Sequence, residues 1–413
     1  MKSSLLSSGA RRRGTLLRAL LVVAVVALTA AVAAGTGAAG GNRSATADPI
    51  KVMTITDLNS QGPVYPNIKY SAQAYAAWIN AKGGINGHKL DLQVCDAQGS
   101  PTQATACARK AISSKVTAVI GSFTFTGDAI MPVLSAGNTA YFGMCCAISA
   151  LEFSSKYSFP IGNQPMYGVG LVKRAVQDGC KKMGTVIIQG AESFIPALNN
   201  AAKGLGTKFV TNVTLPATSQ DYSPQVAQAT SGTDCLIMIV SETPYIAWMA
   251  PFAQSGAKVR MYGPQGNLNQ KVAKGYEKAA EGSVIGGMFA DMSLPQWAGY
   301  RAALKLIKAP PGEDYNSFGG MGTWAAYSAF TQIVKTIKGP INNASFFATA
   351  SKAKLNLPGM IPRIDFTKEW TNGIPGLNRL FNRTVIFSKI HNGQVVPLTN
   401  KFEDVTNLAL GKP

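Results

Sequence analysis

Residues 75–90, YAAWINAKGGINGHKL, join a helix to a strand through two closely spaced turns. Apolar side chains recur at helical spacing across residues 68–81, which predicts an amphipathic helix there. Gly83-Gly84 ends that helix, and Asn86-Gly87 predicts a tight turn. The apolar stretch over residues 90–95 then predicts a strand. A helix that leads through such turns into a strand is a repeating element of α/β sheets.

The same alternation of strands and helices runs outward from this stretch in both directions. A first series has strands expected over residues 50–56, 90–95, 117–120 and 140–142, and a second series has strands over residues 184–188, 208–213, 235–240 and 259–263. Helices are expected between them, over residues 68–81, 101–113, 126–136, 166–178, 195–204, 224–230 and 244–254. Further helices are expected near residues 295–308 and 323–337, and late strands near residues 361–366 and 384–388.

This order predicts an α/β fold with two doubly wound, parallel-sheet lobes. Proteins of that class bind ligands in loops at the carboxyl ends of strands. The candidate ligand loops are therefore residues 57–65, 121–126, 143–149, 189–194, 241–243 and 264–267.

Composition supports a folded, exported protein. Of the 413 residues, 46% are hydrophobic and 14% are charged, which argues against disorder. The formal net charge of +19 falls to +13 once residues 1–47 are set aside, with 33 basic and 20 acidic residues left. Those 47 residues contain Arg11-Arg12-Arg13, then an uncharged run from residue 19 to 41, then small residues, which is the order of a secretory signal.

Ala45-Thr46-Ala47 predicts cleavage before Asp48, and Ala31-Val32-Ala33 is a second candidate cleavage site. The Arg12-Arg13 pair also fits twin-arginine export. The apolar run is long enough to span a bilayer, but its Ala and Gly content favours cleavage over retention as an anchor. No Cys occurs among residues 1–94, so we expect no lipid anchor at a lipobox cysteine.

Six cysteines in an exported chain predict disulfide bonds. Cys95 ends a predicted strand and Cys107 lies on the helix that packs back on it, so a Cys95–Cys107 bond is expected. Cys180 and Cys235 lie at equivalent ends of two predicted strands and form the second expected pair. For the adjacent Cys145 and Cys146, the sequence leaves open a vicinal disulfide or two reduced thiols.

Enzymatic motifs are sparse. His88 and His391 both lie beside Asn-Gly or Gly turns, and the chain has no zinc motif, nucleophile elbow, Walker loop or dinucleotide fingerprint. We expect no enzyme activity, no metal and no cofactor. The enzymatic alternative would use Cys145 or Cys146 as a nucleophile. Basic residues do not form runs with aromatic residues after residue 47, so a nucleic-acid partner is not expected.

Two stretches carry a resemblance to a known family. The segment quoted above resembles the helix–turn–strand signature of type I periplasmic binding proteins, and specifically of the branched-chain amino-acid (Leu/Ile/Val) binding proteins of ABC importers. Residues 262–267, YGPQGN, are similar to that family's loop at the end of a second-lobe strand. The resemblance covers roughly residues 48–400 and implies two Rossmann-like lobes joined by a three-strand hinge. Lobe 1 is then residues 48–162 and 290–380, and lobe 2 is residues 163–289 and 381–413.

The resemblance also implies a site, with departures from the family pattern. The family's first lobe holds a ligand carboxylate with a Ser and a Thr. Thr124 and Thr126 are the candidates to replace the Ser, whereas Ala147 stands at the Thr position. Gln265 stands where the family has a Glu that pairs with the ligand's ammonium group, and Glu242 is a candidate source of the missing charge.

The remaining candidate ligand-binding residues lie in the same loops: Tyr65, Phe123, Phe125, Cys146, Phe194 and Thr243. For the three Phe residues, core packing and pocket lining stay open as alternatives.

The expected function is capture of a small organic solute between the lobes for an ABC importer. Gln265 and the Phe residues favour an amide-like, aromatic or otherwise apolar solute over a standard branched-chain amino acid. The protein is expected to act as a monomer in the periplasm or outside the cell, associated with the envelope and in contact with an ABC permease. The alternative is an extracellular receptor of the same fold that reports ligand to a signalling partner.

Overall fold

The computed structural model describes residues 47–216, 219 and 221–413 of the chain. The expected export signal, residues 1–47, lies outside the described residues except for Ala47. Among the described residues, no helix combines the length and the apolarity needed to cross a membrane.

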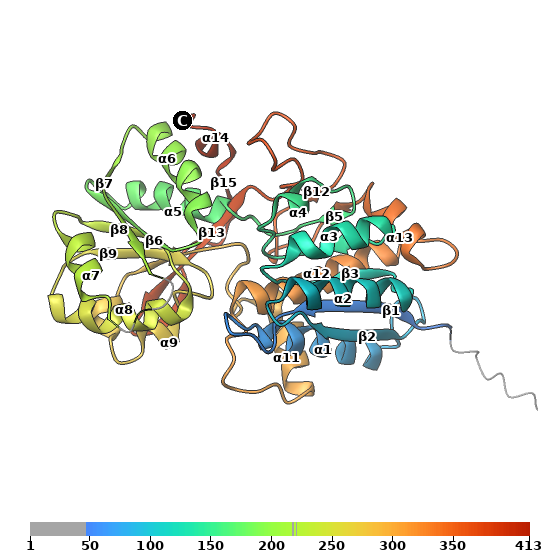
Figure 1. Cartoon of the computed structure of the whole chain (residues 1–413). Coiled ribbons are helices and arrows are strands. Elements are labelled where there is room, and N and C mark those ends of the chain that lie inside the picture. Colours follow the sequence, from blue (N-terminus) through green and yellow to red (C-terminus); the bar gives the residue numbers. More distant parts are fainter. Residues whose placement is uncertain (1–46, 217–218, 220) are drawn as a thin grey trace, which may run out of the picture. The chain divides into compact units, whose positions relative to one another are not determined.

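The first sheet has five parallel strands in the order β2-β1-β3-β4-β5 (Figure 1). These strands are β1 (Ile50–Thr56), β2 (Leu90–Asp96), β3 (Ala118–Ile120), β4 (Tyr141–Phe142) and β5 (Ser158–Phe159). Helices α2 (Pro101–Ser113) and α3 (Gly127–Ala136) pack together on this sheet, and α4 (Ala150–Ser154) follows β4. Helix α1 (Pro66–Ala81) packs against α11 (Ala298–Leu306) and α12 (Phe318–Val334), which come from much later in the chain.

The turns of the quoted stretch depend on glycine. Gly83, Gly84 and Gly87 have φ values of 95°, 85° and 85°, in the left-handed region that favours glycine. A Cβ on Gly84 would lie 2.0 Å from the carbonyl oxygen of His88. The chain can therefore turn from α1 into β2 only with glycine at position 84.

The second sheet repeats the same strand order. Strands β7 (Phe209–Leu215), β6 (Met183–Ile188), β8 (Cys235–Ile239), β9 (Arg260–Pro264) and β10 (Val284–Gly287) are adjacent and parallel. Strand β13 (Thr384–His391) pairs antiparallel with β10, and β14 (Gln394–Pro397) and β15 (Glu403–Asp404) pair with β13. The fold class expected from the sequence, two parallel-sheet α/β lobes, is thereby confirmed.

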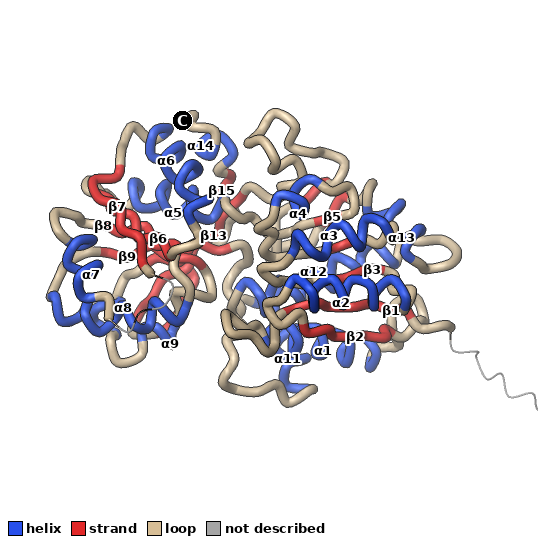
Figure 2. The backbone as a smooth tube through the Cα atoms, in the orientation of Figure 1, coloured by secondary structure: helices blue, strands red, loops and turns tan. Residues whose placement is uncertain are grey.

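Helices enclose the second sheet as they do the first (Figure 2). Helix α5 (Met166–Gln177) packs against α6 (Ile195–Gly204) and α14 (Thr406–Ala409), while α7 (Ser223–Thr230) packs against α8 (Glu242–Ser255). Short helices α9 (Gln270–Ala273) and α10 (Glu277–Ala280) follow β9, and a 3-10 turn, η1 (Glu192–Phe194), precedes α6. Buried side chains of α7 and α8 form a separate apolar cluster on one face of this sheet.

The chain passes three times between the parts of the fold that surround the two main sheets. It does so between β5 and α5, between β10 and the 3-10 turn η2 (Pro295–Trp297), and between β12 (Ile364–Asp365) and β13. We propose these three segments as the hinge, with lobe boundaries at residues 162, 289 and 380. A further helix, α13 (Asn343–Ala350), packs on α12, and β11 (Lys354–Leu355) pairs with β12.

Candidate ligand-binding site

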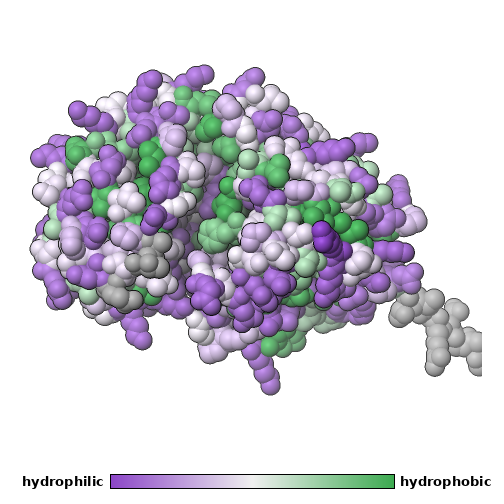
Figure 3. Space-filling view, viewed as in Figure 1, coloured by the Kyte–Doolittle hydropathy of each residue, from purple (hydrophilic) through white to green (hydrophobic). Residues whose placement is uncertain are grey.

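Two cavities lie among the loops that follow strands of both sheets. The acidic cavity has a volume of about 570 Å³ and is lined by residues 61–67, 241–244, 266, 267, 271, 313, 314, 317 and 318. The apolar cavity has a volume of about 370 Å³ and is lined by residues 147, 148, 150, 153, 164, 165, 193, 194, 196, 197, 200 and 374–377. Each cavity thus draws its walls from loops of both lobes. Figure 3 shows a surface hollow in which hydrophobic residues gather.

A larger hollow of about 710 Å³ lies beside Cys180 and Cys235, where the strands of the second sheet begin. Ligands in this fold class bind at the opposite ends of the strands, so we do not place the site there. The atoms of Cys180, Asp234 and Cys235 that could bind a metal lie within 4.8 Å of one another. Both sulfur atoms belong to a disulfide bond, so they offer no thiolate to a metal ion.

The acidic cavity contains three carboxylates, Glu242, Glu313 and Asp314, and one lysine, Lys271. The Asn269 side chain donates to Glu242 and, over 3.4 Å, to Asp314. Lys271 lies 3.5 Å from a Glu242 oxygen. Burial raises the pKa of Asp314 to about 6, and the nearby Glu242 carboxylate adds to this increase. Glu242 is therefore paired within the second lobe, and the contact between Asn269 and Asp314 joins the two lobes.

The rings of Tyr65 and Phe123 pack edge to face at the wall of the acidic cavity. Their ring centroids lie 4.8 Å apart, and the ring centroids of Phe123 and Phe318 lie 6.2 Å apart. Phe123 is buried, whereas Phe125 is 55% exposed. Of these two residues, Phe125 has a side chain free to contact a solute.

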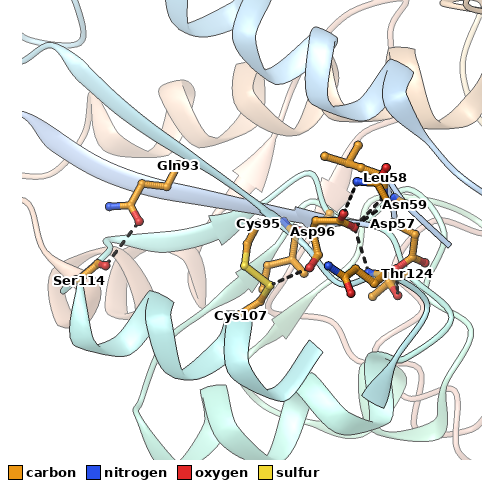
Figure 4. Close-up of a disulfide and its surroundings, with 12 residues drawn as sticks. Asp57, Leu58, Asn59, Gln93, Cys95, Asp96, Cys107, Ser114 and Thr124 are labelled. Carbon is orange, nitrogen blue, oxygen red and sulfur yellow. Dashed lines mark hydrogen bonds between the residues drawn. A yellow bond between two sulfur atoms is a disulfide. The ribbon is translucent and has the colours of Figure 1, made fainter. Parts of the chain in front are cut away.

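Thr124 points into the first lobe rather than into either cavity. Its buried hydroxyl donates to Asp57 over 3.1 Å (Figure 4). It also lies 2.8 Å from the hydroxyl of Thr126. Asp57 also accepts a bond from the backbone N–H of Gly99. These contacts tie the loops after β1, β2 and β3 together.

The loop after β4 forms one wall of the apolar cavity. Cys145 and Cys146 are joined by a disulfide bond and are buried, and Ala147 follows them at the cavity wall. The wall from the second lobe includes Phe194, whose ring lies 5.3 Å from that of Tyr167. The sequence alternative of a vicinal disulfide is thus the one that the structure contains.

A buried carboxylate holds this loop in place. Glu152 accepts hydrogen bonds from the backbone N–H groups of Ile148 and Ser149, each over 2.9 Å, and the Ser149 hydroxyl accepts from Glu152 N–H. This is a capping box at the start of α4. Burial raises the pKa of Glu152 to about 7. Sequence reasoning missed Glu152, although the spacing Ser149-x-x-Glu152 is a recognisable signal.

Gln265 uses its whole amide group inside the protein. Its nitrogen donates to the carbonyl oxygen of Phe289 over 3.0 Å, and its oxygen accepts from the N–H groups of Met288 and Phe289 over 3.2 and 3.3 Å. The side chain therefore anchors the segment after β10 to the end of β9. The structure places Tyr65, Glu242 and Thr243 at the acidic cavity and Ala147 and Phe194 at the apolar cavity, with Gln265 lining neither.

The other two disulfide bonds join the residues expected from the sequence. Cys95 of β2 is bonded to Cys107 of α2, with their Cα atoms 5.8 Å apart (Figure 4). Cys235 of β8 is bonded to Cys180, which follows α5, with Cα atoms 6.0 Å apart. The first bond joins helix α2 to strand β2, and the second joins the loop after α5 to strand β8.

Two α/β lobes whose strand-end loops line shared cavities define a two-lobed solute-binding protein. The chain belongs to the periplasmic binding protein family, whose sequence model matches residues 49–377.

Individual relatives agree with this membership. The chain is 24% identical over 320 residues to the Leu/Ile/Val-binding protein of Escherichia coli (strain K12), covering 70% of this chain and 79% of that protein. Among solved structures, it is similar to an R. palustris solute-binding protein in complex with 4-hydroxybenzoate, at 18% identity and a TM-score of 0.69, covering 87% and 98% of the two chains. A fatty acid ABC transporter substrate-binding protein from Thermomonospora curvata has 19% identity and a TM-score of 0.68, covering 88% and 94%.

Proposed function

We propose that the protein is exported and captures a small organic solute between its lobes for an ABC importer. The observation that carries this proposal is that strand-end loops of both sheets line each of the two cavities. A solute that contacts both lobes stabilises their closed arrangement, and closure hides the solute from water. A permease that recognises the closed arrangement can then distinguish loaded protein from empty protein.

The solute is proposed to differ from a standard branched-chain amino acid. An amino acid needs a carboxylate to pair with its ammonium group, and the position that resembles the family's Glu is Gln265, whose amide is bonded to residues 288 and 289. Glu242 is paired with Asn269 and Lys271. The names of similar structures, which include 4-hydroxybenzoate and fatty acid binders, support a wider range of solutes for this fold.

The proposed contact residues fall into two groups. Tyr65, Phe125, Glu242 and Thr243 lie at or beside the acidic cavity, and Ala147 and Phe194 line the apolar cavity. We propose that four residues do not contact the solute and instead fix the loops that carry the contact residues: Phe123, Thr124, Thr126 and Cys146. The proposed role of Gln265 is likewise to position the hinge.

Calorimetric titration of the purified protein tests the proposal. The titrants are leucine, isoleucine, benzamide, benzoate and 4-hydroxybenzoate. The expected result is that one or more of the aromatic compounds binds and the two amino acids do not. Micromolar binding of leucine would contradict the proposed solute class, and small-angle scattering of the same samples checks whether binding compacts the protein.

A further inference from the structure

The apolar cavity has no charged side chain among its lining residues. Its walls are aliphatic, aromatic, proline or small residues, with Gln164, Ser193 and Asn200 as the polar exceptions. A buried charge without a partner costs several kcal/mol, so a cavity with this lining selects against ions. This separates it from the acidic cavity, which contains four charged residues.

Apolar side chains at the edge of this cavity remain exposed on both lobes. Ile148 and Leu151 of the first lobe are 38% and 39% exposed, and Ile195 of the second lobe is 37% exposed. Ile148 lines the cavity, and the other two flank lining residues. Exposed apolar residues that gather at one place mark a binding surface more often than scattered ones do. Their position on both lobes fits a solute that the lobes enclose together.

Several backbone N–H groups at helix N-termini near the cavity, which could otherwise bind an anion, already have partners. At the start of α4, Glu152 accepts from two backbone N–H groups. At the start of α6, Ile195 N–H donates to Glu192, and the next residue, Pro196, has no N–H. At the start of α5, Met166 N–H donates to Asn163. These donors are therefore unavailable to a ligand carboxylate.

One polar atom at the cavity lacks a partner. The amide oxygen of Gln164, a lining residue, is buried and has no hydrogen-bond partner among the described residues. An unpaired buried acceptor is costly, and a ligand O–H or N–H group would satisfy it. The cavity thus offers apolar walls and, once the Gln164 side chain turns toward it, one acceptor.

We infer that the apolar cavity receives an uncharged apolar or aromatic group that carries one hydrogen-bond donor, such as an alcohol or an amide. The inference rests on the proposed function and narrows its solute class, because it excludes both carboxylate and ammonium groups from this cavity. The volume of about 370 Å³ lies within the range of small-molecule sites.

The test uses the uncharged dye Nile red, whose fluorescence rises in apolar surroundings, with the full protein. Benzyl alcohol, toluene, benzoate and benzylamine then compete with the bound dye. Benzyl alcohol is expected to compete at a concentration at least about tenfold below benzoate and benzylamine, because a charge loses its hydration in this cavity. The concentration of toluene needed for competition is expected to lie between that of benzyl alcohol and those of the two charged compounds, because toluene has no donor.

Ile148→Glu is expected to weaken dye binding at least about tenfold. Leu306→Glu makes the same change at a 56% exposed residue that lines neither cavity, and is expected to leave binding unchanged. Thermal unfolding of both variants confirms that they fold. In Gln164→Leu, benzyl alcohol and toluene are expected to compete at equal concentrations, because the acceptor for the alcohol is gone.

Stronger competition by benzoate or benzylamine than by benzyl alcohol would overturn the inference, as would unchanged dye binding in folded Ile148→Glu. Small-angle scattering of the same samples distinguishes a wrong solute class from a wrong capture mechanism. If benzoate compacts the protein and benzyl alcohol does not, solute capture between the lobes stands and the uncharged class is wrong. If no solute that binds compacts the protein, the proposed capture mechanism itself fails.

Discussion

The buried carboxyl group of Glu152 gives stability a pH dependence that a single substitution removes. Its side chain is buried and accepts from the N–H groups of Ile148 and Ser149. Burial raises its pKa from 4.5 to about 7. Glu152→Gln keeps an oxygen that accepts the same two bonds but cannot ionise.

The sign follows from proton binding. The folded protein holds the Glu152 proton more tightly than the unfolded chain does, so this group stabilises the fold fully below pH 4.5. That stabilisation is lost as the pH rises through the folded pKa of about 7. A difference of this size corresponds to about 3 kcal/mol. The free energy of unfolding of Glu152→Gln, minus that of the natural protein, should therefore increase by about 3 kcal/mol between pH 4 and pH 8.5 (~1.4 kcal/mol per pKa unit).

Guanidinium denaturation followed by tryptophan fluorescence, with the disulfide bonds intact, measures this difference across the pH range. Other carboxylates titrate equally in both proteins and cancel in the subtraction. Glu277→Gln is the control, because a hydrogen bond from Gly275 N–H lowers the pKa of that exposed carboxylate. Parallel stability curves for Glu152→Gln and the natural protein would contradict a raised pKa of Glu152 in the folded protein.

Two further predictions concern stability alone. Replacing Cys180 and Cys235 with Ser opens a loop with a sequence separation of 55 and should cost about 4 kcal/mol, whereas opening the 95–107 disulfide, with a separation of 12, should cost about 3 kcal/mol. Denaturation midpoints under oxidising conditions check this order, and a larger loss from the shorter loop would contradict it. Gln265→Ala leaves two backbone N–H groups and one carbonyl oxygen of residues 288 and 289 without this partner, and should cost about 2 to 4 kcal/mol of unfolding free energy. An unchanged midpoint would show that water replaces the amide.

The first half of the fold was predictable because its signals are local. The strand over residues 50–56 and the helix over residues 101–113 have the same bounds in the structure as in the sequence analysis. Strand β10 was not predicted, because Val284-Ile285-Gly286-Gly287 is short and half glycine. The glycines are needed by distant neighbours, since a Cβ on Gly286 would lie 2.7 Å from Leu171. No local pattern reveals that approach.

Late elements were predicted less well for the same reason. Residues 361–366 were expected to form a strand, but β12 contains only residues 364 and 365. Helix α12 begins at Phe318, five residues before the expected start, because the Ser317 side chain caps it by accepting from Gly320 N–H. Glycine has a low helix propensity, so the two glycines after Phe318 make this helix start hard to predict from the sequence.

The roles of two residues near the candidate site could not be predicted from the sequence. Resemblance locates Gln265 at a strand end, but its hydrogen-bond partners lie more than twenty residues further along the chain. The burial of Glu152 depends on Gly127 of α3, where a Cβ would lie 2.4 Å from the carboxyl carbon. Both roles depend on contacts between elements, which spacing in the sequence does not encode.

Native mass spectrometry of the protein, purified from the cells that make it, identifies the solute that it captures. We expect a co-purifying organic solute that dissociates on unfolding and carries no ammonium group. A bound mass equal to leucine, isoleucine or valine would contradict it.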